Sequence, residues 1–149
     1  MPAHDPPIDV LLVDDNPDDA EFTLRALRKA NPSLRVTIAA DGVAALDYMF
    51  CTGEYATRAP VAPRVVLLDL KLPKVDGLEV LRRIKGDPRT RGVPVVVLTS
   101  SKERRDIHEA YARRANSYIV KPVEYVELVA KLTDLIRYWL EFNQSTPGE

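Results

Sequence analysis

Four apolar segments of this 149-residue chain end in side chains that can do chemistry. Asp14 and Asp15 end the segment VLLVDD, and Asp69 ends VVLLD. Thr99 lies near the end of VVVLTS, and Lys121 follows SYIV. A buried carboxylate without a partner is costly or has its pKa raised. Two adjacent carboxylates directly after an apolar run therefore indicate a cation that balances their charge.

These residue types suit phosphoryl transfer if the fold gathers them. Three clustered carboxylates repel one another unless a cation joins them, and oxygen ligands suit a hard ion such as Mg2+. The ion, the Lys121 ammonium and the Thr99 hydroxyl could then contact a phosphoryl group, for which charge neutralisation is most of the catalysis. A carboxylate can itself be the nucleophile and form an aspartyl phosphate. We expect Asp69 to be this nucleophile, with Asp14 and Asp15 holding the metal.

The segments that carry these residues have the composition of buried strands. Runs of β-branched residues and Leu without alternation are typical of a parallel sheet that is covered on both faces. A fifth and less apolar segment, residues 35–42, is expected at an edge of the sheet.

Helical patterns lie between the expected strands. Asn16 can cap the first helix with Pro17 at its first position, and SSKE predicts a capping box from Ser100 to Glu103. The five helices are expected at about 17–30, 43–50 and 77–86, from 100 or 101 onward, and from after 122 to about 142.

Alternation of five strands with five helices predicts a doubly wound α/β fold, flavodoxin-like, with a parallel sheet and an extended C-terminal helix. We adopt the strand order 2-1-3-4-5, which places strands 1 and 3 at the switch point. Ligands bind there, at the carboxyl ends of the strands. One domain is expected over residues 8–142, with tails at 1–7 and 143–149.

Composition and charge bear on the cellular location of the protein and on its classes of partner. The net charge of −1 gives no electrostatic case for nucleic acid or for an anionic membrane. The single cysteine, Cys51, cannot form an internal disulfide, which fits a reducing compartment. No apolar run approaches the ~20 residues of a membrane span, and the first residues lack the pattern of a signal peptide. We expect a cytoplasmic location, with neither nucleic acid nor membrane as a partner.

The motifs LLVDDNP, VVLLDLKLPKVDG, VVVLTSS and YIVKP, in this order, resemble the receiver domain of two-component response regulators. The resemblance covers about residues 8–140, and the joint pattern is highly specific. The long irregular segment at 52–63, the LPKVDG motif and the YWL near the end are most similar to the small single-domain regulators that serve bacterial and cyanobacterial phytochromes.

The resemblance implies a phosphorylation site with a metal ion. It implies that Asp69 accepts a phosphoryl group from a sensor histidine kinase, with a phytochrome as the narrower expectation. It also implies Mg2+ bound by Asp14, Asp15, Asp69 and the backbone carbonyl of Lys71. Lys71 departs from the Asn or other polar residue frequent at this position of the subgroup, so the rate of dephosphorylation does not follow from the resemblance.

The resemblance further implies a switch that leads to an unidentified downstream protein. Thr99 would be the switch hydroxyl, Tyr118 the aromatic ring whose rotamer is coupled to it, and Lys121 the phosphate contact. The peptide bond from Lys121 to Pro122 would be cis. Such a protein is no enzyme beyond catalysing its own phosphorylation and dephosphorylation.

Other interpretations stay open at this point. A phosphate-independent adaptor would keep the fold but would not need the metal acids, Thr99 and Lys121 together. A Mg2+-dependent phosphatase of the haloacid-dehalogenase kind needs a second Asp two residues after the nucleophile, where this chain has Lys71. Taken singly, several residues have structural interpretations: helix capping for Asp14, Asp15 and Thr99, a turn for Asp69, packing for Tyr118, and solvation for Lys121.

The last expected helix is longer than the sheet that it would cover. About 19 residues span about 28 Å, whereas a strand spans about 17–20 Å. Two apolar stripes run along it: Leu128, Leu132, Leu135, Trp139 and Phe142, and beside them Val129, Ile136 and Leu140. One stripe must cover the sheet, and an exposed apolar stripe usually marks an interface. We expect a two-fold homodimer built on this helix, with the fifth strand and the fourth helix as further candidates for the interface; the alternative is an end that folds back over the fifth strand. Its expected interface residues are Leu132, Ile136, Trp139 and Leu140.

Overall fold

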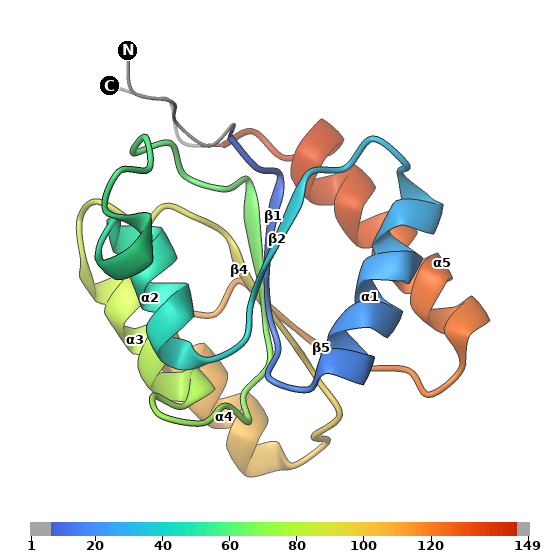
Figure 1. The fold of residues 1–149 in the computed structure, drawn as a ribbon. Coiled ribbons are helices and arrows are strands. Elements are labelled where there is room, and N and C mark those ends of the chain that lie inside the picture. The colour runs from blue at the N-terminus through green and yellow to red at the C-terminus, as the bar shows by residue number, and fades with distance from the viewer. Residues whose placement is uncertain (1–6, 146–149) are drawn as a thin grey trace.

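A five-stranded parallel sheet lies between two layers of helices in the computed structural model of the chain, which describes residues 7–145 (Figure 1). The strand order is β2-β1-β3-β4-β5, as predicted. The strands are β1 (Val10–Val13), β2 (Val36–Ala39), β3 (Val65–Leu68), β4 (Val95–Thr99) and β5 (Ser117–Val120). The predicted edge position of the second strand is therefore confirmed, and β1 and β3 lie side by side at the switch point. The tails expected at 1–7 and 143–149 fall largely outside the described residues.

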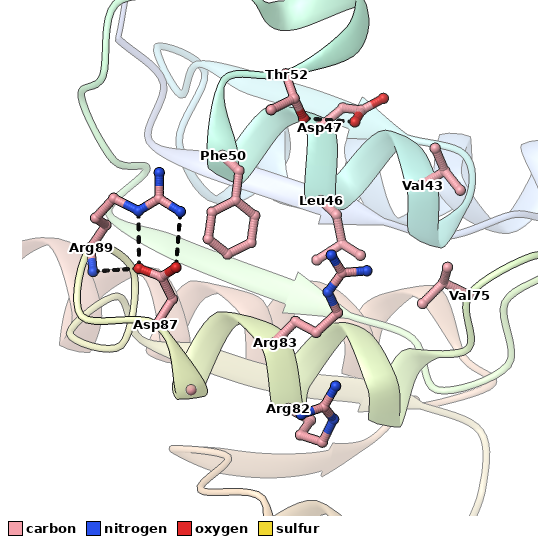
Figure 2. A pocket seen from close by; sticks show the side chains of 11 residues that line it. Val43, Leu46, Asp47, Phe50, Thr52, Val75, Arg82, Arg83, Asp87 and Arg89 are labelled. Carbon is pink, nitrogen blue, oxygen red and sulfur yellow. Dashed lines mark hydrogen bonds and ion pairs between the residues drawn. The ribbon is translucent and has the colours of Figure 1, made fainter.

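Helices cover both faces of this sheet. They are α1 (Pro17–Ala30), α2 (Gly42–Phe50), α3 (Gly77–Gly86), α4 (Arg104–Ala112) and α5 (Tyr125–Ile136), with a short 3-10 turn η1 (Gly53–Tyr55) and a π-helical end η2 (Arg137–Phe142). The helices α1 and α5 pack on one face, and α2, α3 and α4 on the other, where α2 and α3 are neighbours (Figures 1 and 2). Within residues 7–145, no helix combines the length and apolar composition that a membrane crossing requires.

Burial on both faces explains the unbroken apolar runs of the sequence. In β1, Leu11 and Val13 belong to the layer of α2, α3 and α4, whereas Val10 and Leu12 belong to the layer of α1 and α5. Successive side chains of a strand point to opposite faces, so both faces of a central strand must be apolar.

Side-chain caps start three of the helices. The Asn16 carboxamide oxygen accepts hydrogen bonds from the backbone N–H groups of Asp18 and Asp19, as predicted. Asp41 and Asp76 cap α2 and α3 in the same way. Such caps satisfy donors that the first helical turn leaves unpaired.

The predicted start of α4 is wrong, because the helix begins at Arg104 and not at Ser100 or Ser101. Ser101 is buried, and its hydroxyl accepts from the Glu103 N–H at 3.2 Å and donates to Asp106 at 2.5 Å. The Ser101 carbonyl accepts from the Tyr118 hydroxyl. These bonds hold residues 100–103 as a loop between the end of β4 and the helix.

The C-terminal helix extends to Phe142 as predicted, with η2 continuing α5. Two of the expected interface residues are buried inside the monomer: Leu132 is 0 % exposed and Ile136 is 4 % exposed. The prediction that their side chains form an interface is wrong, because α5 packs against α1 as well as the sheet and uses both stripes there. Trp139 and Leu140 are only partly buried against the same layer.

Candidate functional site

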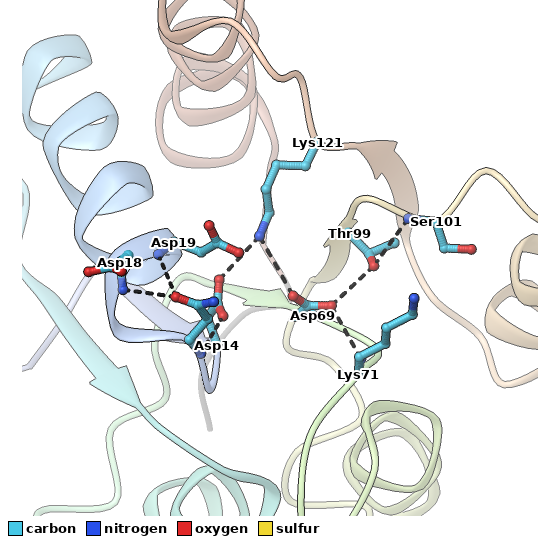
Figure 3. Close-up of polar contacts among 9 residues, drawn as sticks. Asp14, Asp18, Asp19, Asp69, Lys71, Thr99, Ser101 and Lys121 are labelled. Atoms are coloured by element: carbon cyan, nitrogen blue, oxygen red, sulfur yellow. Dashed lines mark hydrogen bonds and ion pairs between the residues drawn. The ribbon is translucent and has the colours of Figure 1, made fainter.

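The carboxyl ends of four strands bring Asp14, Asp69, Thr99 and Lys121 together (Figure 3). The Lys121 Nζ lies 3.1 Å from Asp14 Oδ2 and 3.6 Å from Asp69 Oδ2. The Thr99 hydroxyl donates to Asp69 Oδ1 at 3.1 Å. Parallel strands end at the same edge of the sheet, so residues that are up to 107 positions apart become neighbours.

Asp14 is the most buried carboxylate of the site, with 3 % of the residue exposed. Burial raises its pKa above the ordinary value, while the Asn16 N–H, which donates to Oδ1 at 3.0 Å, and the Lys121 ammonium act in the opposite direction. The nearby Asp69 charge also raises the pKa. The carboxylate is thus partly compensated by protein groups, as expected for a buried charge.

The two oxygens of Asp69 have different surroundings. Its Oδ1 accepts hydrogen bonds from the Thr99 hydroxyl and from the backbone N–H of Lys71 at 3.2 Å. Its Oδ2 faces Lys121 at 3.6 Å, which is an ion-pair distance and longer than a hydrogen bond. Of the two oxygens, Oδ2 is therefore the one with room to form a new bond.

Asp15 and Lys71 lie at the rim of the site. Both are exposed, and Asp15 makes no hydrogen bond or ion pair within residues 7–145. In the same range, no three side chains of Asp, Glu, His or Cys lie in a metal-binding arrangement. The structure therefore joins Asp14 and Asp69 through Lys121, rather than gathering all three predicted carboxylates.

The donor set nevertheless fits a hard divalent cation. Mg2+ typically takes one or two carboxylates, keeps several waters and uses substrate phosphate oxygens as further ligands. Asp15 is a free carboxylate next to Asp14, and Asp69 Oδ2 is only loosely engaged. A site of this kind needs no closed cage of three protein carboxylates.

Ser101 links the site to Tyr118, and its role was missed by sequence reasoning. The Tyr118 hydroxyl donates to the Ser101 carbonyl at 2.9 Å, and the Ser101 N–H lies 3.5 Å from the Thr99 hydroxyl oxygen. Burial raises the pKa of the Tyr118 hydroxyl, and the bond to Ser101 opposes that shift. A path of contacts thus leads from Asp69 through Thr99 and Ser101 to Tyr118. The sequence feature that could have indicated this role is Ser101, the second serine of the SS pair, whereas the capping-box pattern indicated Ser100.

The peptide bond from Lys121 to Pro122 is trans, since the described residues contain no cis peptide bond. The expectation of a cis bond is therefore wrong for this structure. The Lys121 N–H donates to the Thr99 carbonyl at 2.7 Å, which carries the lysine to the site in register with β4. The trans form is also the favoured isomer before proline, by about 0.5–1 kcal/mol.

Residues 10–133 match the response regulator receiver domain. The chain belongs to this family. The probable methanogenesis regulatory protein FilR2 of Methanothrix harundinacea is 44 % identical over 148 residues, which cover 99 % of this chain and 92 % of FilR2. Response regulator Rcp1 of Synechocystis sp. is 35 % identical over 136 residues, 91 % of each protein.

Solved structures of single-domain regulators have the same fold. The phosphorylated cyanobacterial phytochrome response regulator RcpA superposes with a TM-score of 0.86 at 34 % identity, covering 95 % of this chain and 100 % of RcpA. The Mn(2+)-bound form of Rcp1 gives a TM-score of 0.83 at 33 % identity over 95 % of this chain and 100 % of Rcp1. This chain is thus similar to phytochrome-associated response regulators over almost its whole length.

Proposed function

We propose that this chain is a single-domain response regulator that accepts a phosphoryl group on Asp69 and relays the signal by protein contacts. The observation that carries the proposal is the convergence of Lys121 and Thr99 on Asp69, whose Oδ2 has no partner closer than 3.6 Å within residues 7–145. The likeness to phosphorylated RcpA supports it. A receiver domain is a signalling module, and we propose no other reaction for this chain.

In the proposed transfer, Asp69 Oδ2 attacks the phosphorus of a phosphohistidine. The new O–P bond forms as the P–N bond breaks, and its electron pair returns to the imidazole nitrogen of the kinase. The Lys121 ammonium and the Thr99 hydroxyl are positioned to contact the phosphoryl oxygens as negative charge gathers on them.

A divalent cation belongs to this proposal. Rcp1 has a Mn(2+)-bound form, and for this chain we propose Mg2+ as the ion. Asp14, Asp15, Asp69 and the backbone carbonyl of Lys71 would hold it. When bound, the ion neutralises charge on the phosphoryl oxygens.

The proposed output passes from Thr99 to Tyr118. A phosphoryl group on Asp69 would compete for the Thr99 hydroxyl that now donates to Oδ1. Thr99, Ser101 and Tyr118 are in sequential contact, so this competition biases the loop before α4 between two arrangements.

A sensor histidine kinase is the partner class of receiver domains, and a phytochrome kinase is the narrower proposal for this chain. The likeness to RcpA, a phytochrome response regulator, supports a phytochrome kinase. FilR2, a probable methanogenesis regulatory protein, has a higher sequence identity to this chain than RcpA has. We further propose a cytoplasmic location, a homodimer, and one domain over residues 8–142. Nucleic acid and membrane are not among the proposed partners.

Incubation with acetyl phosphate and Mg2+, followed by mass spectrometry of the intact chain, tests the phosphorylation. The parent should gain one phosphoryl group, and Asp69→Asn should gain none. Asp76→Asn is the matched control, because Asp76 is an exposed aspartate in the same β3–α3 segment, and it should be labelled like the parent. Labelling of Asp69→Asn at the parent's level would overturn the assignment. Rapid turnover would favour a phosphatase, and no reaction would favour an adaptor.

A further inference from the structure

A cleft of about 520 Å3 separates α2 from α3 on the face opposite α1 and α5 (Figure 2). Its apolar lining comes from Val43, Leu46 and Phe50 of α2 and from Val75 in the segment before α3. Val43 is 40 % exposed and Phe50 is partly buried, so apolar surface is open to a partner here.

Arginines line the other side of this α2–α3 cleft. Arg82 is paired with Glu79 at 2.7 Å, and Arg89 with Asp87 at 2.9 Å. Arg83 makes no hydrogen bond or ion pair within residues 7–145, and its guanidinium reaches toward Leu46 across the cleft (Figure 2). The cleft therefore has one arginine outside these pairs beside apolar side chains, and the carboxylates of Asp47 and Asp87 line it as well.

A second cleft, of about 370 Å3, lies on the other side of α3 and shares Arg82 with the first. Among the residues that the structure describes, no carboxylate lines it. Its cationic lining residues are Arg82, Lys85, Arg91, Arg113 and Arg114. Of these, Lys85 is buried, and Arg82 and Arg113 are paired with Glu79 and Glu109. Across the surface formed by the two clefts, called the α3 surface below, Arg83, Arg91 and Arg114 have no ion-pair partner within residues 7–145, while Asp47 and Asp87 line the first cleft.

Compensation of the helix dipole explains only part of this charge. Arg83 and Lys85 lie in the last turn of α3, where cations are favoured. Arg89 and Arg91, however, come from the segment between α3 and β4, and Arg114 follows α4. Cations from three segments converge on one surface, which fits recognition of an acidic partner.

The α2–α3 cleft also touches the segment that carries Asp69. A Cβ at Gly42 would lie 2.0 Å from the Val75 carbonyl oxygen, so the start of α2 packs tightly on the residues between β3 and α3. Lys74 of this segment pairs with Asp41 at 3.2 Å. A partner in the cleft would therefore contact the same segment that carries the phosphorylation site.

We propose that the α2–α3 cleft binds an acidic segment of a partner protein, with an apolar side chain against Val43 and Phe50 and a carboxylate on Arg83. The apolar lining favours a polypeptide over a nucleic acid, and the charge favours Glu and Asp in that polypeptide. This inference rests on the proposed function and deepens it, since it names the surface and the chemistry of the downstream partner. The cleft lies away from β5 and α5, so a homodimer there leaves it open.

A fluorescein-labelled Glu/Leu peptide of helical periodicity is the probe, and fluorescence anisotropy with the full chain is the measurement. Arg83→Glu and Val43→Asp should each weaken binding at least about tenfold, or about 1.4 kcal/mol. Arg28→Glu on α1 makes the same charge change on the opposite layer, and Val61→Asp alters a valine that is 49 % exposed outside the cleft. Both control variants should bind like the parent.

Several results would overturn the inference: no saturable binding, equal binding of a Lys/Leu peptide, or equal loss in Arg28→Glu and Arg83→Glu. Loss of a homodimer in Arg83→Glu, seen by light scattering, would also overturn it, because a second copy would then be the occupant. Acetyl phosphate labelling of every variant separates the two proposals. If the parent is labelled at Asp69 but does not bind the peptide, the cleft proposal alone is wrong. If the parent is not labelled, the proposed phosphorylation site is wrong.

Discussion

The Lys121 ammonium balances the negative charge of two carboxylates in the site. Its side chain is 12 % exposed and lies between a carboxylate that is 2 % exposed, Asp14, and one that is 15 % exposed, Asp69. Two carboxylates this close to one ammonium are stabilised by it when no other cation is bound. The same cation is available to a phosphoryl group, so one residue serves both the resting site and the proposed transfer.

Removing this ammonium should destabilise the fold. Lys121→Met is expected to lower the free energy of unfolding by about 2–4 kcal/mol at neutral pH without metal, because a partly buried charge loses its partner. Urea unfolding measures the loss, and added Mg2+ should restore part of it. Lys71→Met is the control, since Lys71 is an exposed lysine two residues after Asp69. An equal loss in both variants would contradict the role of Lys121.

Lys85 is a second buried lysine, far from this site and only 7 % exposed. Its ammonium donates to the carbonyls of Arg91 at 3.1 Å and Val93 at 2.8 Å. Lys85→Met leaves both carbonyls without this donor, so we expect a loss of stability of about 1–3 kcal/mol at neutral pH. Urea unfolding gives the value. No change in stability would mean that water replaces the ammonium.

The loss in Lys85→Met should also depend on pH. Burial lowers the pKa of Lys85 in the folded protein, whereas a lysine in the unfolded chain has a pKa of about 10.4. Between the lowered value and about 10.4 the unfolded chain binds more protons, so the parent gains stability as pH rises, and Lys85→Met lacks this gain. The difference between the two proteins should therefore be larger at about pH 10 than at about pH 7. Lys29→Met, at an exposed lysine of α1, is the control.

At the scale of elements, the loop before α4 depends on one of two adjacent serines. Ser101→Ala should lower the free energy of unfolding by about 0.5–2 kcal/mol, because the Glu103 N–H and Asp106 both lose a hydrogen-bond partner. Ser100 is exposed and makes no hydrogen bond within residues 7–145, so Ser100→Ala should change stability by less than about 0.5 kcal/mol. Thermal or urea unfolding compares the two. The opposite ranking would restore the capping box predicted from the sequence.

Element types were predictable where local chemistry decides them. Unbroken apolar runs indicated the strands, and Asn16 with Pro17 indicated the start of α1. The start of α4 was not predictable, because contact with Tyr118 holds residues 100–103 out of the helix. The irregular segment 52–63 is similar: Arg58 is 7 % exposed there and binds the Tyr48 carbonyl at 2.7 Å, which no local pattern indicates.

The site was predictable to a similar degree. Strand ends fixed which residues share one edge of the sheet, so Asp14, Asp69, Thr99 and Lys121 were identified together. The exposed position of Asp15 and the link from Thr99 through Ser101 to Tyr118 depend on the conformation of the loops that follow the strands. The burial of Leu132 and Ile136 depends on α5 packing against α1, which amphipathic spacing alone does not specify.

At the scale of the molecule, the sheet leaves β5 as an edge strand beside the last helix. All four residues of β5 are only partly buried. A groove of about 680 Å3 runs between this strand and the C-terminal helix, with Tyr138 and Trp139 at its end in edge-to-face contact at 4.9 Å between ring centroids. Exposed strand edges and aromatic anchors both favour association. The proposed homodimer therefore keeps Trp139 and the fifth strand of the sequence-based expectation, and Tyr138 takes the place of the two buried residues.

We expect the parent to be a dimer at tens of micromolar by light scattering, and Tyr138→Asp to be a monomer, because a carboxylate would be buried without a partner in the interface. Tyr111→Asp on α4 is the matched control, since Tyr111 is 50 % exposed and Tyr138 49 %. Because Tyr118 also lines the groove, acetyl phosphate should strengthen the dimer of the parent. A monomeric parent, or equal dissociation by both variants, would show that the groove beside β5 is not the interface.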